Sequence, residues 1–330
     1  METLTPPLIC PRCQVIFKST VVFQRHVKTQ TNVCREAERI LAGGKEDRYL
    51  EWKGNKYRVR DFIAGHVPSE VSRIVSPFFG SGAVEFQLLR NRPKLQVQAS
   101  DLDLGLITFW QQLLNSPPDV VNKLETVIPK NRIVTGSTFN KWKAALQGNP
   151  KCLRTDLNIA TAFWTVNQLA FNGFMDGNAC SWNASQAEKL LRFREKRFRH
   201  LLAFKPLLPS RLHFTACDCF DAIQQASPDA LLFVDPPYLS TTQYKAGGAF
   251  GSSLHQKLRG VLGAHPRWIL CHADNPDVRE LYSGFEAVEY LQHSAINQGG
   301  SRITAAPAGK SSKRCELLIL SPWVAEQLHS

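Results

Sequence analysis

The residues best suited to chemistry in this chain are an acid, two prolines and a tyrosine that directly follow the apolar run Ala230–Val234. Such a run predicts a buried parallel strand, and open α/β sheets bind ligands beyond the carboxyl ends of their strands. An acid and a proline carbonyl at that edge could accept hydrogen bonds from an amino group while the aromatic ring stacks on a planar base. Those groups suit methylation of an exocyclic base nitrogen, whereas the plainer interpretation is an ordinary turn. The candidate catalytic residues are Asp235, Pro236, Pro237 and Tyr238.

A glycine-bearing turn upstream could bring a ligand close to the backbone. The segment Arg73–Ser76 is typical of a strand, and it leads through Gly80 and Gly82 into a segment typical of a helix. Glycine adopts backbone angles that are closed to other residues and permits a ligand to approach closely. A second strand-like segment ends in Asp101, about 20 residues beyond the turn, where a ribose-binding acid is expected. Strand, glycine turn and acid in this order favour a ribose-containing cofactor over an incidental surface acid.

These residues resemble the motifs of the Dam-like DNA adenine-N6 methyltransferases, which use S-adenosylmethionine and a catalytic Asp-Pro-Pro-Tyr. The run 52–57 is similar to the family's Trp-x-Gly-Gly-Lys-Tyr element, with Asn55 in place of the second glycine. The run 77–82 matches its Pro-Phe-x-Gly-x-Gly, and residues 297–302 and 316–318 are similar to its closing hairpin and last strand. The resemblance implies a set of cofactor-binding residues: Trp52, Lys56, Phe78, Phe79, Gly80, Gly82, Asp101, Asp218 and Asp235.

The resemblance also implies a mechanism of methyl transfer. Adenine must leave the duplex, because its amino group is inaccessible inside the base stack. Tyr238 would then stack on the flipped base while Asp235 and the Pro236 carbonyl accept the amino hydrogens. Two other functions stay open: an amino methyltransferase acting on cytosine N4 or on RNA, and an inactive zinc-finger protein that only clamps DNA. The Asn55 departure is the one feature that favours the inactive clamp.

Length and composition agree with a globular enzyme that acts on nucleic acid. The 330 residues can bury a sizeable core, and no apolar stretch is long enough to span a bilayer. A formal net charge of +12 favours an anionic partner; we expect double-stranded DNA, and no obligate protein partner is implied. The amino terminus lacks the pattern of a signal peptide. We therefore expect a cytoplasmic location in a bacterium or a phage-infected cell, or a nuclear one in a eukaryote.

Nine cysteines in a chain without a secretion signal indicate reduced thiols or metal ligands. Four candidate ligands lie in residues 1–40, where the spacing and the intervening apolar residues predict a small ββα zinc finger. Zinc would supply the folding energy of so small a module and would be structural, since methyl transfer needs no metal. The fourth ligand lies farther from the third than is usual, and the alternative is a disordered extension with incidental cysteines. The expected ligands are Cys10, Cys13, His26 and Cys34.

The expected fold class is α/β, with a Rossmann-like methyltransferase sheet formed by residues 45–135 and 208–330. An inserted helical target-recognition domain is expected at 136–207, and a small ββα zinc finger at the amino terminus. Within the insert, Ser185 and Glu188 form a capping box that predicts the start of a helix.

Basic side chains in two segments are expected to contact DNA phosphates. One group lies on a single face of the helix predicted within the insert, and the other in the glycine- and lysine-rich stretch 297–314. A solvated surface is the plainer interpretation of each, but their place in a base-methylating chain favours phosphate binding. The nine histidines show no partner pattern and are expected to serve packing or the surface. The candidate DNA-binding residues are Arg192, Lys196, Arg199, Arg302, Lys310 and Lys313.

Overall fold

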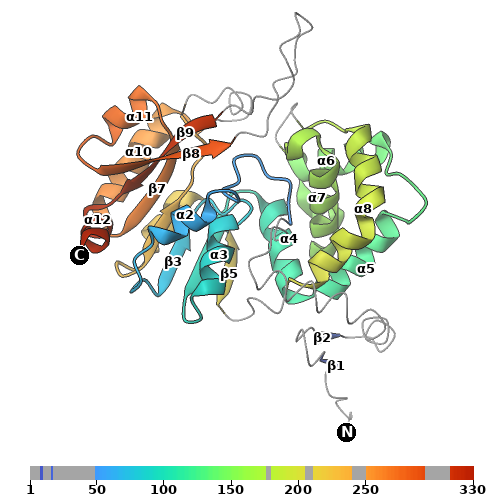
Figure 1. The fold of residues 1–330 in the computed structure, drawn as a ribbon. Coiled ribbons are helices and arrows are strands. Elements are labelled where there is room, and N and C mark those ends of the chain that lie inside the picture. Colours follow the sequence, from blue (N-terminus) through green and yellow to red (C-terminus); the bar gives the residue numbers. More distant parts are fainter. Residues whose placement is uncertain are drawn as a thin grey trace, which may run out of the picture. The chain divides into compact units, whose positions relative to one another are not determined.

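In a computed structural model of the protein, the larger of the two sheets in the described residues has seven strands (Figure 1). The pairs β4–β5, β3–β6 and β6–β7 are parallel, whereas β9 runs antiparallel to both β7 and β8. The predicted α/β class with a mostly parallel, Rossmann-like sheet is thereby confirmed. In spatial order the strands are β5 (Leu212–Ala216), β4 (Gln96–Asp101), β3 (Arg73–Ser76), β6 (Leu231–Val234), β7 (Trp268–Ala273), β9 (Lys313–Leu320) and β8 (Glu286–His293).

The chain divides into two units, each with its own packing. One unit contains the described residues up to Asn55 together with Phe79–Asp218, and the other contains Lys56–Phe78 and Cys219–Ser330. No helix in the described ranges is long and apolar enough to cross a membrane. The structure describes residues 8–9, 16–17, 49–175, 180–204, 211–239, 250–293 and 313–330, without the side chains of 8–9, 16–17, 292–293 and 313–314.

Apolar side chains explain why the central strands form where they do. Every residue of β6 is buried, and β7 is buried except at its last residue. Uninterrupted burial of this kind is typical of strands covered on both faces. Helices α10 (Ser252–Ala264) and α11 (Pro276–Leu281) supply Leu258, Leu262 and Val278 to the core that these strands share. Other helices of this unit are α2 (Arg60–Gly65), α9 (Cys219–Gln224) and α12 (Pro322–His329).

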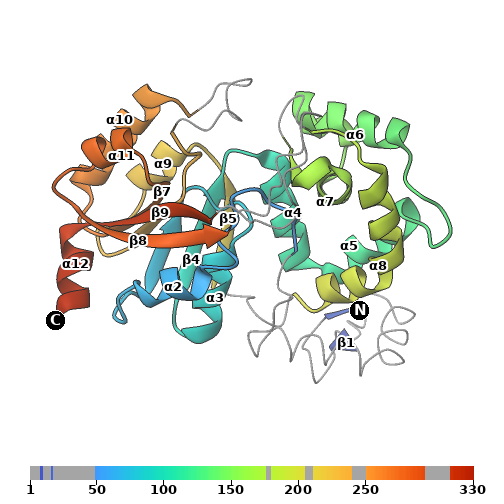
Figure 2. The ribbon, with the colours of Figure 1, turned by 45° about the horizontal axis from the view of Figure 1, so that its top comes forward.

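Helix α7 (Asp156–Leu169) is the centre of the helical part of the other unit. All of its residues from Ile159 onward are buried, as expected for a helix with neighbours on every side. Four helices pack around it, and Figures 1 and 2 show them side by side. They are α4 (Leu104–Asn115), α5 (Pro117–Val127), α6 (Gly136–Gly148) and α8 (Ala184–Leu202); α3 (Ala83–Asn91) and the short turns η1 (Pro150–Leu153) and η2 (Phe171–Gly173) belong to the same unit.

The start of α8 differs from the sequence-based prediction. The Asn183 side chain accepts a hydrogen bond from the amide of Gln186 at 3.0 Å and is the N-cap. The predicted capping residue, Ser185, therefore lies inside the first turn. Asparagine caps a helix as well as serine does, so the earlier residue could take this role.

Asn167, a buried residue of α7, holds the chain at Glu51. Its side-chain oxygen accepts a hydrogen bond from the Glu51 amide at 2.9 Å, and its amide group donates to the Glu51 carbonyl at 2.8 Å. Gly173, with φ of +68°, approaches the same residue so closely that an added Cβ would lie 1.9 Å from the Glu51 carbonyl oxygen. The helical part of the unit thus fixes the backbone immediately before Trp52.

The described part of the amino-terminal segment is a short antiparallel ladder. β1 (Leu8–Ile9) pairs with β2 (Ile16–Phe17). The expected zinc ligands lie outside the described residues: Cys10, Cys13, His26 and Cys34.

Candidate active site

The acid of the Asp-Pro-Pro-Tyr run, Asp235, forms a partly buried ion pair at the end of β6. Lys56 places its Nζ 2.7 Å and 2.8 Å from the two carboxylate oxygens of Asp235. The lysine side chain is 4% exposed and the aspartate side chain 21%. Burial alone would lower the pKa of Lys56, but the Asp235 and Glu316 carboxylates raise it above its usual value. Burial raises the pKa of Asp235, and the ion pair with Lys56 opposes that rise.

The tyrosine of the same run is anchored through its hydroxyl. Tyr238 donates a hydrogen bond to Oε2 of Glu316 at 2.9 Å, and Tyr290 donates to the same oxygen at 2.8 Å. Glu316 lies on β9 and is 6% exposed. Burial and the nearby Asp235 charge raise the pKa of Tyr238 well above its usual value. The phenol therefore stays protonated and remains a hydrogen-bond donor, while the Lys56 ammonium lies 5.0 Å from the ring centre.

The glycine turn and the candidate ribose-binding acid, Asp101, lie close together in the unit that contains Phe79–Asp218. The Gly80 amide donates to Asp101 Oδ2 at 3.1 Å, and the Asp103 amide donates to Oδ1 at the same distance. Gly80 has φ of +52°, and an added Cβ would lie 2.7 Å from Nε1 of Trp52. Burial raises the pKa of Asp101 to about 6, although the two amide hydrogen bonds lower it. Trp52, Gly80 and Asp101 thus lie close together.

The phenylalanines and the second acid of the predicted cofactor set have different surroundings. Phe79 is 3% exposed and packs edge-on against Phe86 and Trp110. Phe78 lies in the unit that contains Cys219–Ser330 and packs against the core of that same unit. Asp218 is exposed, two residues beyond the point at which β5 pairs with the last residue of β4.

Asn55 occupies a position that does not need glycine. Among the described residues, only Arg154 and Asn172 combine a side chain with a positive φ. The positive φ of this turn is carried by Gly54, at +75°. Asn55 instead donates its side-chain amide to the Trp52 carbonyl at 2.6 Å and closes the turn. The backbone geometry of the loop is therefore compatible with the substitution.

The predicted DNA-binding residues are only partly described. Arg192 and Lys196 are exposed on α8, and Arg199 on the same helix is half-buried. Arg302 and Lys310 lie outside the described residues, and Lys313 is described only by its backbone at the start of β9. In the described part of the chain, no three His, Cys, Asp or Glu side chains group as metal ligands do.

The mostly parallel sheet, with an Asp-Pro-Pro-Tyr run after β6 and a glycine turn after β3, defines a Rossmann-like methyltransferase. The family model for the D12 class N6 adenine-specific DNA methyltransferases matches residues 52–296 of the sequence. The chain therefore belongs to that family.

Three relatives illustrate the range of similarity. A DNA adenine methylase of Vibrio cholerae is 25% identical over 299 residues, covering 86% of this chain and 99% of the relative. A DNA adenine methylase of Haemophilus influenzae is 21% identical, covering 76% of this chain and 87% of the relative. The type II methyltransferase M.CviBI of Paramecium bursaria Chlorella virus NC1A is 22% identical, covering 73% and 88%. The alignment with a solved precorrin 8w decarboxylase covers 82% of this chain and 92% of that one, at 12% identity and a TM-score of 0.34.

Sequence reasoning missed the supports of the Asp-Pro-Pro-Tyr run. Glu316 was noted only for its similarity to a family strand, and Tyr290 was not singled out. A signal for Glu316 does exist, because it is the one charged residue in the apolar run 315–320. A buried acid in such a strand requires hydrogen-bond partners, which here are two tyrosines.

Replacing Lys56 with methionine should make stability depend more strongly on pH. The folded-state pKa of Asp235 is raised, so its contribution to stability is present at low pH and is lost as the pH rises through that pKa. Without Lys56 this loss should grow, because an unpaired carboxylate is then buried. We expect the variant to lose about 2–3 kcal/mol more unfolding free energy, relative to wild type, at about pH 8 than at about pH 5. Urea unfolding at both pH values measures the difference.

The double variant Lys56→Met/Asp235→Asn should regain most of the stability lost at high pH, since it removes the unpaired charge. Lys189→Met, at an exposed position on α8, is the matched control and should behave as wild type. An equal loss at both pH values, with no recovery in the double variant, would mean that Lys56 acts through packing alone.

Proposed function

We propose that the protein transfers a methyl group from S-adenosylmethionine to the N6 amino group of adenine in double-stranded DNA. The observation that supports this most strongly is the Asp-Pro-Pro-Tyr run. Its carboxylate forms an ion pair with Lys56, and its phenol donates a hydrogen bond to Glu316. Membership of the D12 class supports adenine as the base and DNA as the polymer.

In this proposal Asp235 and the Pro236 carbonyl accept the two amino hydrogens of the base. Each carboxylate oxygen has more than one lone pair, so Asp235 can accept an amino hydrogen while its ion pair with Lys56 persists. These two acceptors draw the nitrogen toward tetrahedral geometry and expose its lone pair. In this proposal Asp235 also takes the proton that the nitrogen loses when the N–C bond to the methyl group forms and the sulfonium C–S bond breaks. Catalysis then consists mainly of positioning and electrostatics.

S-adenosylmethionine, when bound, supplies an electrophilic methyl group on a sulfonium. The residues that would hold it are Trp52, the glycine turn at Gly80 and Gly82, and Asp101 at the ribose. Their fit is supported by the close backbone approach at Gly80 and by the partly buried carboxylate of Asp101, which is bonded to the turn. Asp218 would accept from the adenine moiety.

DNA would be held by phosphate contacts, and the target base would be extruded from the duplex. A net charge of +12 supports an anionic partner. We assign phosphate contacts to the helical segment 136–207 and to the basic stretch near the carboxyl terminus, through Arg192, Lys196, Arg199, Arg302, Lys310 and Lys313.

Replacing Asp235 with alanine should lower methyl transfer by about 100-fold or more while cofactor binding persists, because one acceptor of the amino group is lost. Labelled methyl transfer to unmethylated plasmid DNA, followed by mass spectrometry of the nucleosides, measures this. Asp229→Ala, at an exposed residue just before β6, is the matched control.

The product identifies the base and the polymer. N6-methyladenine supports the proposal, and methylated cytosine would overturn the base. No transfer to DNA by a folded protein that binds S-adenosylmethionine would contradict the proposal, and transfer to RNA would then identify the alternative polymer.

The affinity for S-adenosylmethionine should fall as the pH is lowered through about 6, the value to which burial raises the pKa of Asp101. The ionised carboxylate accepts hydrogen bonds from ribose hydroxyls more strongly than the neutral form does. Below the pKa of Asp101, the affinity should therefore fall by up to about tenfold for each pH unit. Calorimetric titration measures it. Asp101→Asn should bind more weakly and without this pH dependence; a wild-type affinity that stays flat between about pH 5 and pH 7 would remove Asp101 from the ribose site.

We further propose a structural zinc ion in the amino-terminal segment, supported by the Cys-x-x-Cys spacing of Cys10 and Cys13 ahead of His26. Purified protein should contain about one zinc per chain by elemental analysis. Cys13→Ser should lose it, whereas Cys152→Ser, at an exposed free thiol, should keep it. Zinc-free wild-type protein purified without chelators would refute the site.

A further inference from the structure

Two buried histidines lie against the Asp-Pro-Pro-Tyr run. His272 is on β7 and is fully buried, and His255 is on α10 and is 1% exposed. Both belong to the same unit as the run. Neither has a role in the mechanism proposed above.

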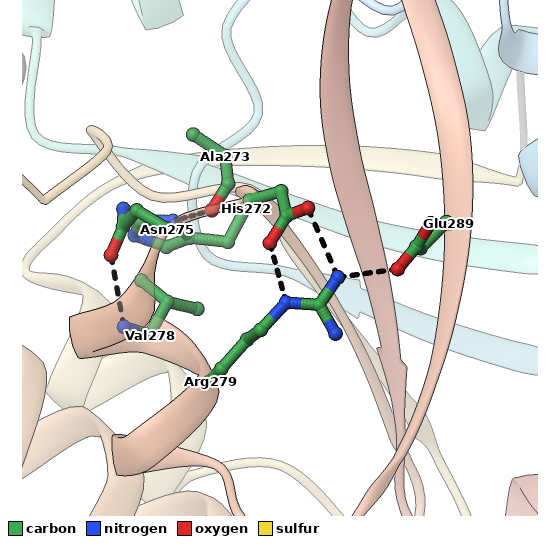
Figure 3. Close-up of polar contacts among 7 residues, drawn as sticks. His272, Ala273, Asn275, Val278, Arg279 and Glu289 are labelled. Carbon is green, nitrogen blue, oxygen red and sulfur yellow. Dashed lines mark hydrogen bonds and ion pairs between the residues drawn. The ribbon is translucent and has the colours of Figure 1, made fainter.

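His272 contacts the run through its ring and through one nitrogen. Its imidazole stacks on the Tyr238 ring, with the ring centres 4.8 Å apart and an interplanar angle of 23°. Its Nε2 lies 3.1 Å from the Leu239 amide. Because that amide can only donate, Nε2 must be the acceptor and the ring proton must lie on Nδ1. Nδ1 lies 3.1 Å from the Ala273 carbonyl, which accepts that proton's hydrogen bond (Figure 3).

His255 contacts the backbone on the other side of the tyrosine. Its Nε2 lies 3.1 Å from the Pro237 carbonyl, which can only accept, so this nitrogen carries the proton. The His255 ring meets the His272 ring edge-on, with centres 5.2 Å apart. Burial lowers the pKa of both histidines, that of His272 to about 4, so both are neutral near neutral pH. The two imidazoles thus bond the carbonyl before Tyr238 and the amide after it.

The end of β7 that carries His272 is itself secured. Arg279 on α11 binds both carboxylate oxygens of Asp274, at 2.6 Å and 3.0 Å, and also contacts Glu289 on β8 (Figure 3). The Asn275 side chain accepts from the Val278 amide at 3.0 Å and caps α11. Asp274 and Asn275, which make these contacts, follow shortly after His272 in the chain, so the contacts hold this end of β7 in place.

We propose that His272 and His255 are positioning residues for methyl transfer, which orient the Tyr238 ring by bonding the backbone on both sides of it. His272 covers one face of that ring, so a flipped base would stack on the opposite face, with the Lys56 ammonium, 5.0 Å from the ring centre, as a neighbour. The base then becomes the third ring of a stack that begins with His272. This inference rests on the proposed function, because it assigns Tyr238 as the platform for the base.

Ordinary core packing is the competing explanation, and paired substitutions separate the two. His272→Phe keeps a planar ring under Tyr238 but removes the acceptor for Leu239. His272→Gln keeps an acceptor near the Nε2 position but removes the ring. His265→Phe is the matched control, because His265 is a half-buried histidine of the same unit that contacts Ser227 and Arg267.

The experiment measures kcat and the KM for S-adenosylmethionine on unmethylated plasmid DNA, with urea unfolding as a check of folding. At least one His272 variant should lose roughly tenfold in kcat, the effect of about one hydrogen bond or one ring contact, with the KM for S-adenosylmethionine unchanged. The less affected variant then shows whether the bond to Leu239 or the ring stack dominates. If both variants stay within about twofold of the His265→Phe control, the positioning role is refuted.

Substitutions at His255 extend the test if the His272 variants do not fold. His255→Leu removes the donor to the Pro237 carbonyl, and His255→Gln retains one. We expect a lower kcat for His255→Leu and rescue by His255→Gln, whereas equal kcat values for wild type and both variants would contradict the proposal. A wild-type protein that makes no N6-methyladenine would refute the proposed function itself, and that result is distinct from normal activity in the variants.

Discussion

The ion pair between Lys56 and Asp235 is the interaction on which the site depends. Placing a carboxylate at the end of a fully buried strand removes much of its hydration, and a paired cation with good geometry is the usual compensation. Lys56 meets this need with contacts to both carboxylate oxygens. A second carboxylate, Glu316, lies close enough to raise the pKa of Lys56 further. Glu316 also accepts hydrogen bonds from two tyrosine hydroxyls. One ammonium therefore interacts with two acids beside the tyrosine.

The antiparallel strands at one side of the sheet do more than complete it. Glu316 pairs in register with Ala273 on β7 and with Tyr290 on β8. This pairing places the Glu316 carboxylate where it accepts hydrogen bonds from the hydroxyls of both Tyr238 and Tyr290. Because side chains alternate between the faces of a sheet, a one-residue shift of β9 would turn Glu316 to the opposite face, and a one-residue shift of β8 would turn Tyr290. The register of β8 and β9 is thus a requirement of the site.

The sequence predicted the parts of the structure that follow from local patterns. The run after β6, the glycine turn after β3 and the acid that ends β4 were all placed at strand ends by short apolar runs. The supports of the run were not predicted, because they join distant residues: Tyr238 and Glu316 are 78 positions apart, and Leu239 and His272 are 33 apart. No spacing rule relates such pairs before the fold is known. The start of α8 was misplaced by a local competition between two good capping residues, Asn183 and Ser185.

Gly173 and Asn167 give the helical part of the chain a consequence for evolution and engineering. Both lie in or after α7, and both contact Glu51, next to the tryptophan that lies against the glycine turn. A helical segment copied from a relative would need an asparagine and a glycine at the same two places. Without the asparagine the loop loses two hydrogen bonds, and without the glycine a Cβ meets the Glu51 carbonyl. The helices are consequently not freely exchangeable, and substitutions in them are constrained to positions that leave the contacts with Glu51 intact.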